Sequence, residues 1–279
     1  MRIGYNTNGF ASHRLTDAIE ILAEIGYQNV AITLDNHALS PFSKTLDDEL
    51  ATVRRLLDRH DMTCVIETGS RFLLDPRRKH QPTLVSPLPE QREVRRLFLE
   101  TAIDIAACLR AEAVSFWSGS LTDDASDKQG WSRLVEECRA LCRYAEPRGV
   151  RLGFEPEPGM LVETTDGFTR LREAVDHPRL GLTLDVGHVH CLGDGEPADH
   201  VRAQRDWLVN VHIEDMRHGT HDHLRFGEGE MDFKAILRAL REIDYAGPVN
   251  VELSRHSHDA VRVATESFEF LTSLGKSLT

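Results

Sequence analysis

Four ionisable side chains follow short apolar runs in the second half of the chain, one after another. They are Glu155 after RLGF, Asp185 in LTLDVG, His212 in VNVHIE and Glu252 in VNVELS. The intervals between them are 30, 27 and 40 residues, each long enough for one strand, one helix and their connections. Three carboxylates and an imidazole gathered in a poorly solvated place would repel one another, because an uncompensated buried charge costs several kcal/mol. A divalent cation resolves this conflict, so we predict a metal site at these four residues.

The predicted ligand set contains three oxygen donors and one nitrogen donor. It therefore favours one fairly hard ion such as Mn²⁺, Mg²⁺ or Co²⁺, with Zn²⁺ as the alternative. Such a cation binds a carbonyl oxygen and an adjacent hydroxyl oxygen together, and it stabilises the enediolate that forms when the intervening C–H loses a proton. The pattern therefore predicts proton transfer at a carbon beside a carbonyl group.

The elements that must position these residues alternate along the whole chain. Strand-like runs are predicted at residues 2–7, 29–35, 63–69, 112–119, 151–157, 180–187, 208–215 and 248–254. Helical spacing of apolar residues is found at 15–27, 46–60, 91–110, 131–146, 167–175, 231–245 and 260–274, and more weakly at 200–207. Strand–helix units of about 35 residues predict an α/β protein, a single (β/α)8 barrel domain over residues 1–279. An open doubly wound sheet is the alternative, but no glycine-rich phosphate motif follows the first strand.

One long segment without periodicity interrupts this alternation at about residues 69–90, and it contains four of the 11 prolines. Loops of this length in compact domains are usually functional or disordered. We interpret the segment as an insertion that covers the substrate, with disorder as the alternative. Its basic run Arg77–His80, like the run Arg92–Arg96, is expected on the solvated surface or against a substrate phosphate.

Composition narrows the classes of function. The chain has 33 Lys and Arg against 45 Asp and Glu, a net charge of −12, which opposes binding to nucleic acid. No apolar run reaches the roughly 18 residues of a membrane span, and the first residues lack a signal-peptide pattern. Five scattered cysteines predict no disulfide framework, and Cys138 and Cys142 are expected to pack in the interior. We expect a cytoplasmic protein without membrane contact.

Several motifs stand in a recognisable order: FEPEPG, LDVGH, VHIED followed by FGEGEMDF, and VNVELS. In these motifs the chain resembles the xylose-isomerase-like TIM-barrel superfamily, which holds sugar isomerases, ketose 3-epimerases, inosose dehydratases and the repair enzymes of AP endonuclease family 2. The segments MRIGYNTNGF and TGSRFLLDPRRKHQPTL are similar to those of sugar phosphate isomerases or epimerases. The resemblance implies that the four residues above bind the metal, and that His188 and Arg217 lie near substrate oxygens. It also implies a homodimer or homotetramer.

The resemblance to the 3-epimerases further implies two proton-transferring carboxylates. Glu155 and Glu252 would act on opposite faces of the substrate while also binding the metal, and Glu157 is the competing base. Trp117 is predicted to form an apolar wall against a sugar ring. The remaining candidates would line the other side of the barrel mouth: Asn6, Asn8, Glu67 and Arg71.

Three alternatives stay open beside a metal-dependent sugar isomerase or epimerase. A dehydratase of the inosose or dehydroshikimate type uses the same metal and base but expels a hydroxyl, with His188 or His223 as the proton donor. A non-enzymatic protein would hold a metabolite without turnover. An endonuclease-IV-like phosphodiesterase would need three zinc ions, yet Trp117 stands where those enzymes place a histidine. A second metal near His188, His221 and His223 is a further hypothesis.

Overall fold

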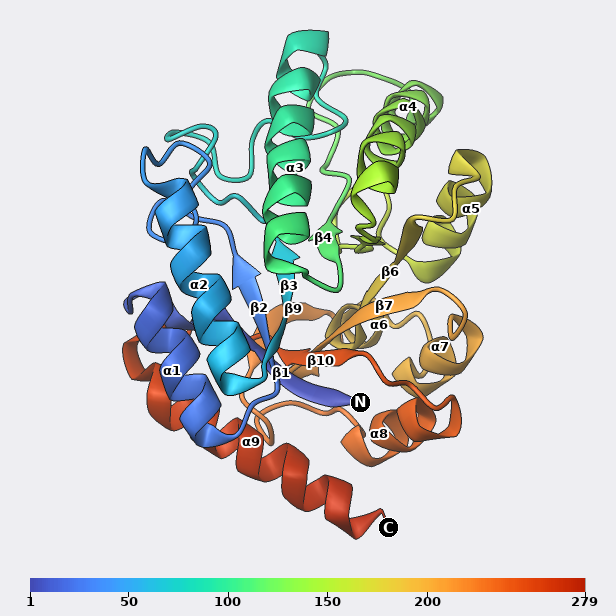
Figure 1. Ribbon diagram of the computed structural model, residues 1–279. Helices are drawn as coiled ribbons and strands as arrows, with labels where there is room; N and C mark the ends of the chain where they lie inside the picture. Colours follow the sequence, from blue (N-terminus) through green and yellow to red (C-terminus); the bar gives the residue numbers. More distant parts are fainter. Residues whose placement is uncertain (279) are drawn as a thin grey trace.

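The computed structural model describes residues 1–278. Its parallel strands form a closed barrel, confirming the predicted (β/α)8 architecture, and Figure 1 shows the helices arranged around it. In order around the barrel the strands are β1 (Arg2–Asn6), β2 (Asn29–Thr33), β3 (Thr63–Glu67), β4 (Val114–Phe116), β5 (Leu152–Phe154), β6 (Leu180–Asp185), β7 (Leu208–Ile213) and β10 (Pro248–Val251). The barrel closes where β10 pairs with β1, with Ile3 opposite Val249.

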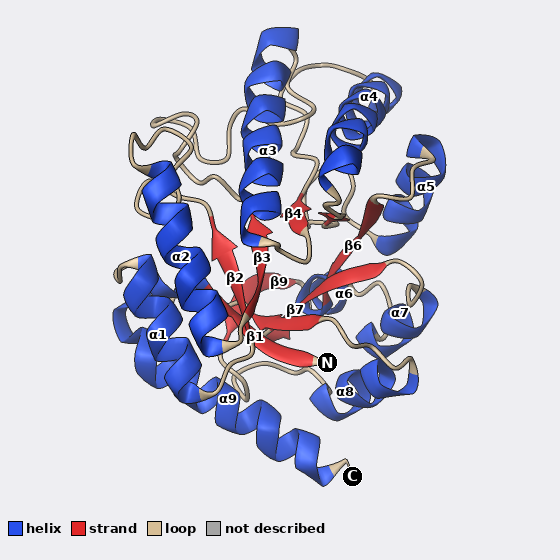
Figure 2. Ribbon diagram, in the orientation of Figure 1, coloured by secondary structure: helices blue, strands red, loops and turns tan. Residues whose placement is uncertain are grey.

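Helices follow the strands as the crossover rule requires (Figure 2). They are α1 (Leu15–Ile25), α2 (Leu46–His60), α3 (Pro89–Leu109), α4 (Asp127–Ala145), α5 (Thr165–Val175), α6 (Val186–Leu192), α7 (Pro197–Ala203), α8 (Phe233–Glu242) and α9 (Ala260–Ser277). Short 3-10 turns lie at Thr7–Phe10, Glu146–Arg148 and Ser257–Asp259. The helix predicted weakly at 200–207 corresponds to α7, whereas α6 was not predicted.

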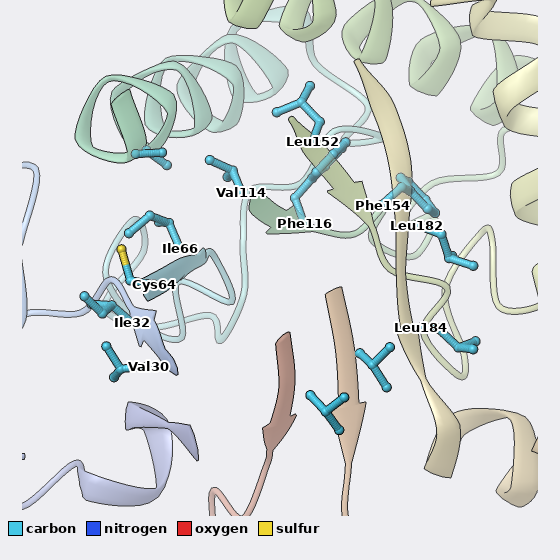
Figure 3. Packing of buried hydrophobic residues seen from close by; sticks show 14 of the residues in the cluster. Val30, Ile32, Cys64, Ile66, Val114, Phe116, Leu152, Phe154, Leu182 and Leu184 are labelled. Carbon is cyan, nitrogen blue, oxygen red and sulfur yellow. The ribbon is translucent and has the colours of Figure 1, made fainter. Parts of the chain in front are cut away.

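The main core lies between the strands and the helices. Alternate strand residues such as Val30, Ile32 and Phe154 are fully buried in one cluster (Figure 3). Helix residues such as Phe168 belong to the same cluster. Burial of each such side chain contributes roughly 1.5–3 kcal/mol relative to exposure. This packing holds the strands in register and therefore fixes the positions of the residues at their ends.

The barrel interior is narrow and filled with small side chains. Ala31, Val65, Ala113 and Val209 form a separate buried cluster there. A Cβ added to Gly153 would lie 2.4 Å from Thr183 Oγ1, so this position has no room for a larger residue. Because the interior is packed, the space for a ligand lies at the carboxyl ends of the strands.

A hairpin that the sequence analysis did not predict follows β7. Its strands are β8 (Asp215–Arg217) and β9 (Thr220–Leu224), which pair antiparallel outside the barrel. The hairpin brings His221 and His223 over the ends of the barrel strands, where both line the cavity described below.

The insertion between β3 and α3 is a packed segment. Leu73, Leu84 and Val85 are buried, and the backbone N–H of His80 donates to the carbonyl of Arg71 across the loop. The expectation that the run Arg92–Arg96 lies on the surface is wrong for Arg95, which is 0% exposed. Its guanidinium donates to Ser70 Oγ and to the Thr68 carbonyl, and so ties α3 to the start of the insertion.

The five cysteines are free, and Cys138 and Cys142 are buried as expected. Across residues 1–278 we find no helix that combines the length and apolar character needed to span a membrane.

Candidate active site

A cavity of about 470 Å³ lies at the carboxyl ends of the barrel strands. Residues from every region predicted to meet at the barrel mouth contribute to it. Its lining includes Asn6, Asn8, Glu67, Arg71, Lys79, His80, Trp117, Glu155, Glu157, Met160, His188, His212, His221, His223, Glu252, Ser254 and Arg255. Most of the side chains named from the sequence are therefore brought to one place.

His212 is the centre of the acidic group. Its Nδ1 lies 2.9 Å from Glu155 Oε1 and 2.9 Å from Glu252 Oε2, and its Nε2 lies 2.9 Å from Glu67 Oε1. The imidazole is 1% exposed. In the metal-free protein an imidazolium at this position compensates the charge of the surrounding carboxylates, which would otherwise be unpaired.

The four predicted ligands fit a metal ion. One ligand atom from each of Glu155, Asp185, His212 and Glu252 lies within 4.8 Å of the others. Asp185 Oδ1 accepts hydrogen bonds from the backbone N–H groups of Gly187 and His188 at the start of α6, which fixes the carboxylate. Its Oδ2 is buried and accepts no hydrogen bond from the residues described. An orphaned carboxylate oxygen beside two other carboxylates is the arrangement that a cation satisfies.

The two predicted proton-transferring carboxylates differ in their electrostatics. Burial raises the pKa of Glu155 to about 7, although the charge of His212 opposes the shift. Burial also acts on Glu252, but there the charge and hydrogen bond of His212 outweigh it and hold the pKa below its usual range. Asn8 Nδ2 donates to Glu252 Oε1 at 2.7 Å, which further favours the carboxylate. Near neutral pH the Glu155 carboxyl group is therefore partly protonated, whereas the Glu252 carboxyl group is ionised.

Glu67 contributes more than the sequence analysis expected. It was assigned only to the far side of the mouth, but it contacts His212 directly and accepts a hydrogen bond from Asn210 Nδ2 at 3.1 Å. No motif signals this contact, because it depends on β3 and β7 facing each other across the barrel. Glu67 therefore orients the imidazole from the side opposite Glu155 and Glu252.

Glu157 and Trp117 both line the cavity, as predicted. Glu157 follows the end of β5, and burial together with the nearby charge of Glu155 raises its pKa well above the usual value. Trp117 is 6% exposed and packs with the guanidinium of Arg95, which lies 4.4 Å from its ring centroid. The indole ring is thus fixed at the wall of the cavity.

Three imidazoles form a second group beside the acidic one. His188 Nδ1 lies 3.1 Å from the Pro156 carbonyl oxygen, and its Nε2 lies 3.0 Å from His221 Nε2. Burial lowers the pKa of His188 to about 4, so the ring is neutral. His188, His221 and His223 bring one nitrogen each within 4.8 Å of the others. The geometry needed for the hypothesis of a second metal is therefore present.

Behind His223 lies a carboxylate that the sequence analysis did not identify. Glu214 is 0% exposed, and neither of its oxygens has a hydrogen-bond partner among the residues described. Glu214 Oε2 lies 3.9 Å from His223 Nδ1. Burial alone lowers the pKa of His223, but its interaction with Glu214 outweighs this and raises the pKa to about 10. Burial also raises the pKa of Glu214 well above its usual value, so His223 and Glu214 form a buried acid–base pair at the wall of the cavity.

The structure does not bring Arg217 to this cavity, contrary to the expectation that it lies near substrate oxygens. Arg217 ends β8 and is exposed, and its guanidinium donates to the carbonyl of Glu228 at 2.8 Å. The hairpin explains the difference, because the chain leaves the barrel after β7 and carries this side chain outward. Arg71, Lys79 and Arg255 are the arginine and lysine side chains found in the lining instead.

With this geometry established, sequence comparison places the chain among known proteins. The sequence pattern of a family described as xylose isomerase-like TIM barrel matches residues 19–274. The chain belongs to this family. An uncharacterized protein of Methanocaldococcus jannaschii is 26% identical over 281 residues, covering 94% of this chain and 86% of that protein. An inosose dehydratase of Geobacillus kaustophilus is 26% identical over 253 residues, covering 81% of this chain and 70% of the dehydratase.

Solved structures of the xylose isomerase-like fold match the whole barrel. A D-tagatose 3-epimerase-like protein superposes with a TM-score of 0.80 at 23% identity, covering 100% of this chain and 98% of the other. The D-allulose 3-epimerase of Methylomonas sp., solved in complex with D-allulose, gives a TM-score of 0.78 at 20% identity, covering 98% and 96% of the two chains. At these identities the match supports the fold.

Proposed function

We propose that this protein is a divalent-metal-dependent isomerase or epimerase that acts on a sugar, sugar phosphate or cyclitol. The observation that carries the proposal is the position of Glu155 and Glu252, which both approach His212 Nδ1 to 2.9 Å inside the cavity. In the barrel order, β6 and β7 separate their strands β5 and β10, so the two carboxylates reach the cavity from different sides. Two carboxyl groups so placed can serve opposite faces of one carbon.

Glu155, Asp185, His212 and Glu252 would hold the metal. When bound, a divalent ion supplies electrophilic stabilisation of the negative charge that develops when a proton leaves the carbon beside a carbonyl. Glu252, whose carboxylate accepts a hydrogen bond from Asn8 Nδ2, is the proton acceptor. Glu155 has a pKa of about 7 and returns a proton from the other side. Trp117 packs against the apolar face of the ring, and Glu157 and His188 bind hydroxyl groups.

The family comparison supports the same class of reaction, since the solved relatives include ketose 3-epimerases. A dehydratase is the second candidate, favoured by the inosose dehydratase among the relatives and by His223. Its imidazolium faces the cavity with the buried Glu214 behind it, and it would protonate a departing hydroxyl.

Solvent isotope exchange tests both candidates. Purified protein is analysed for bound metal and then incubated in D₂O with ketoses, inososes and their phosphates. We expect deuterium to enter the carbon beside the carbonyl without loss of water. Loss of water identifies the dehydratase, whereas a metal-loaded protein that exchanges no proton in any compound overturns the proposed function.

A further inference from the structure

The walls of the cavity carry opposite charges. Glu155, Glu157 and Glu252 line one part of it, whereas the insertion contributes Arg71 and Lys79. This basic contribution stands out in a chain of net charge −12. Residues 69–88 hold four basic side chains, Arg71, Arg77, Arg78 and Lys79, against the single acidic Asp75.

The cations of the lining differ in how they are paired. Arg71 Nη2 donates to the Asn8 carbonyl at 3.2 Å, and its Nη1 forms a long ion pair with Asp35 Oδ2 at 3.6 Å. Arg255 is paired with Asp222. Lys79 makes no ion pair within 4.0 Å among the residues described. The charge of Lys79 is therefore available for a ligand, and the Arg71 guanidinium beside it makes no hydrogen bond to the Asp35 carboxylate.

The backbone of the insertion holds these two residues in place. Ser70, Arg71 and His80 adopt positive φ angles of 54°, 34° and 67°, which non-glycine residues rarely adopt. Hydrogen bonds maintain this conformation, from the His80 N–H to the Arg71 carbonyl at 2.6 Å and from the Arg95 guanidinium to Ser70 Oγ at 2.6 Å. Strained backbone that is kept in place by its surroundings is typical of ligand-binding segments.

Arg71 is also close to the reacting groups. The Asn8 carbonyl accepts from Arg71, while the Asn8 side-chain amide donates to Glu252 Oε1 at 2.7 Å. One residue thus separates the guanidinium from a carboxylate that we assign to proton transfer. An anion on Arg71 would lie within the reach of a sugar whose reacting carbon faces Glu252.

We propose that the substrate carries a phosphate or carboxylate group, which Arg71 and Lys79 bind while the reacting carbon faces Glu155 and Glu252. This inference rests on the proposed function and narrows its substrate class. A guanidinium binds either anion through paired N–H groups, and an ammonium adds a point charge. A neutral hydroxyl group would leave the Lys79 ammonium without a counter-charge.

Inorganic phosphate is the first probe, with binding followed by ³¹P NMR. We expect Arg71→Gln and Lys79→Gln each to weaken phosphate binding about tenfold, a typical loss for a charge-assisted hydrogen bond. The double variant Arg77→Gln/Arg78→Gln is the matched control, since it removes two charges from the same insertion outside the cavity, and it should bind as the wild type does. Asp185→Ala removes a predicted metal ligand and should still bind phosphate. Binding that is lost in Asp185→Ala but unchanged in Arg71→Gln/Lys79→Gln overturns the inference.

A second measurement identifies the anion and separates this inference from the proposed function. Deuterium exchange is compared for fructose, fructose 6-phosphate and 5-ketogluconate. If fructose 6-phosphate exchanges its proton for deuterium faster than fructose does, and Arg71→Gln reduces this exchange at least tenfold, the anion is a phosphate. The same result with 5-ketogluconate assigns a carboxylate. Exchange that is fastest with fructose and unchanged in Arg71→Gln overturns the inference but leaves the proposed function standing. Phosphate binding that depends on Arg71 and Lys79, without exchange in any sugar, supports the anion site but overturns the proposed function.

Discussion

His212 explains how the metal-free protein tolerates so many buried carboxylates. Burial alone lowers the pKa of this imidazole, but the charges of Glu67, Glu155 and Glu252 outweigh burial and raise the pKa well above the usual value. The ring is therefore protonated near neutral pH when no metal is present. A metal ion needs the neutral imidazole, so it must displace this proton.

Metal binding is consequently expected to release protons and to weaken as the pH falls. Since the neighbouring carboxylates raise the His212 pKa well above its usual value, the apparent metal affinity should fall as the pH is lowered from 7 to 5, by up to about tenfold per pH unit for each proton released. Titration of chelator-treated protein with Mn²⁺ in weak buffer measures the released protons directly. An affinity that is flat between pH 5 and 7 would show that His212 is already neutral or is not a ligand.

The acidic residues divide into those needed for the metal and those needed for the reaction. Glu252→Gln keeps one ligand oxygen but removes the proton acceptor, so we expect turnover to fall roughly 10²–10⁴-fold while metal content is partly retained. Asp185→Ala should lower metal content itself, because it removes a buried carboxylate oxygen that accepts no hydrogen bond from the residues described. Metal analysis beside isotope exchange separates the two effects. The exposed Glu230→Gln serves as the control, and wild-type turnover in Glu252→Gln would exclude Glu252 from the mechanism.

At the residue scale, the sequence predicted best where function follows from strand position. Glu155, Asp185, His212 and Glu252 could be found because each ends an apolar run or directly follows one. The contact of Glu67 with His212 could not be found in this way, since it depends on the diameter of the closed barrel. Arg217 was misplaced because nothing in its spacing reveals where the hairpin leaves the barrel.

At the scale of elements, Arg95 joins α3 to the end of β3 and to the insertion. It is fully buried, it contacts Trp117, and its hydrogen bonds go to neutral oxygens of Thr68 and Ser70. Burial lowers its pKa to about 9, which leaves it charged at neutral pH. Arg95 therefore supports the cavity wall from the protein interior, although it does not line the cavity itself.

Replacing this residue should loosen the insertion. Arg95→Met removes the donors to Ser70 and Thr68, and leaving such buried acceptors unpaired costs about 1–3 kcal/mol. Urea unfolding gives the change in the free energy of unfolding, and limited proteolysis should detect new cleavage within residues 70–80. Arg96→Met is the matched control one residue away, where the salt bridges to Glu100 and Glu137 are partly exposed and contribute at most about 1 kcal/mol. Equal stability of the two variants would contradict the role given to Arg95.

The secondary structure could be predicted where the pattern was apolar and regular. The eight barrel strands were found because their buried β-branched and aliphatic residues form short runs. The strand Thr220–Leu224 was missed because its sequence, THDHL, is mostly polar and lies outside the barrel. The helix Val186–Leu192 was missed since it begins directly after β6, and its cap Asp185 was considered only as a predicted metal ligand.

For the whole molecule, the proposed metal site joins strands from opposite ends of the second half of the chain. Because a metal binds the folded state, it should stabilise the protein by about 2.7 kcal/mol at a concentration 100 times its dissociation constant. For a chain of this length we expect the melting temperature to rise by about 5–10 °C. Calorimetry with Mn²⁺ and with chelator measures the difference, and Asp185→Ala should show almost none. A melting temperature that metal leaves unchanged in the wild type would argue against the site.

The hydrogen bond from Asn8 to Glu252 spans 244 residues of sequence, and the pairing of β1 with β10 spans slightly more. At synthesis rates of about 5–20 residues per second, the ribosome needs on the order of 10–50 seconds to make the chain between these two positions. During that time β1 has an unpaired edge, which is prone to join other strands. The nascent chain therefore gains its reactive pocket only after β10 and Glu252 have been made, and its first strand needs protection from aggregation until then.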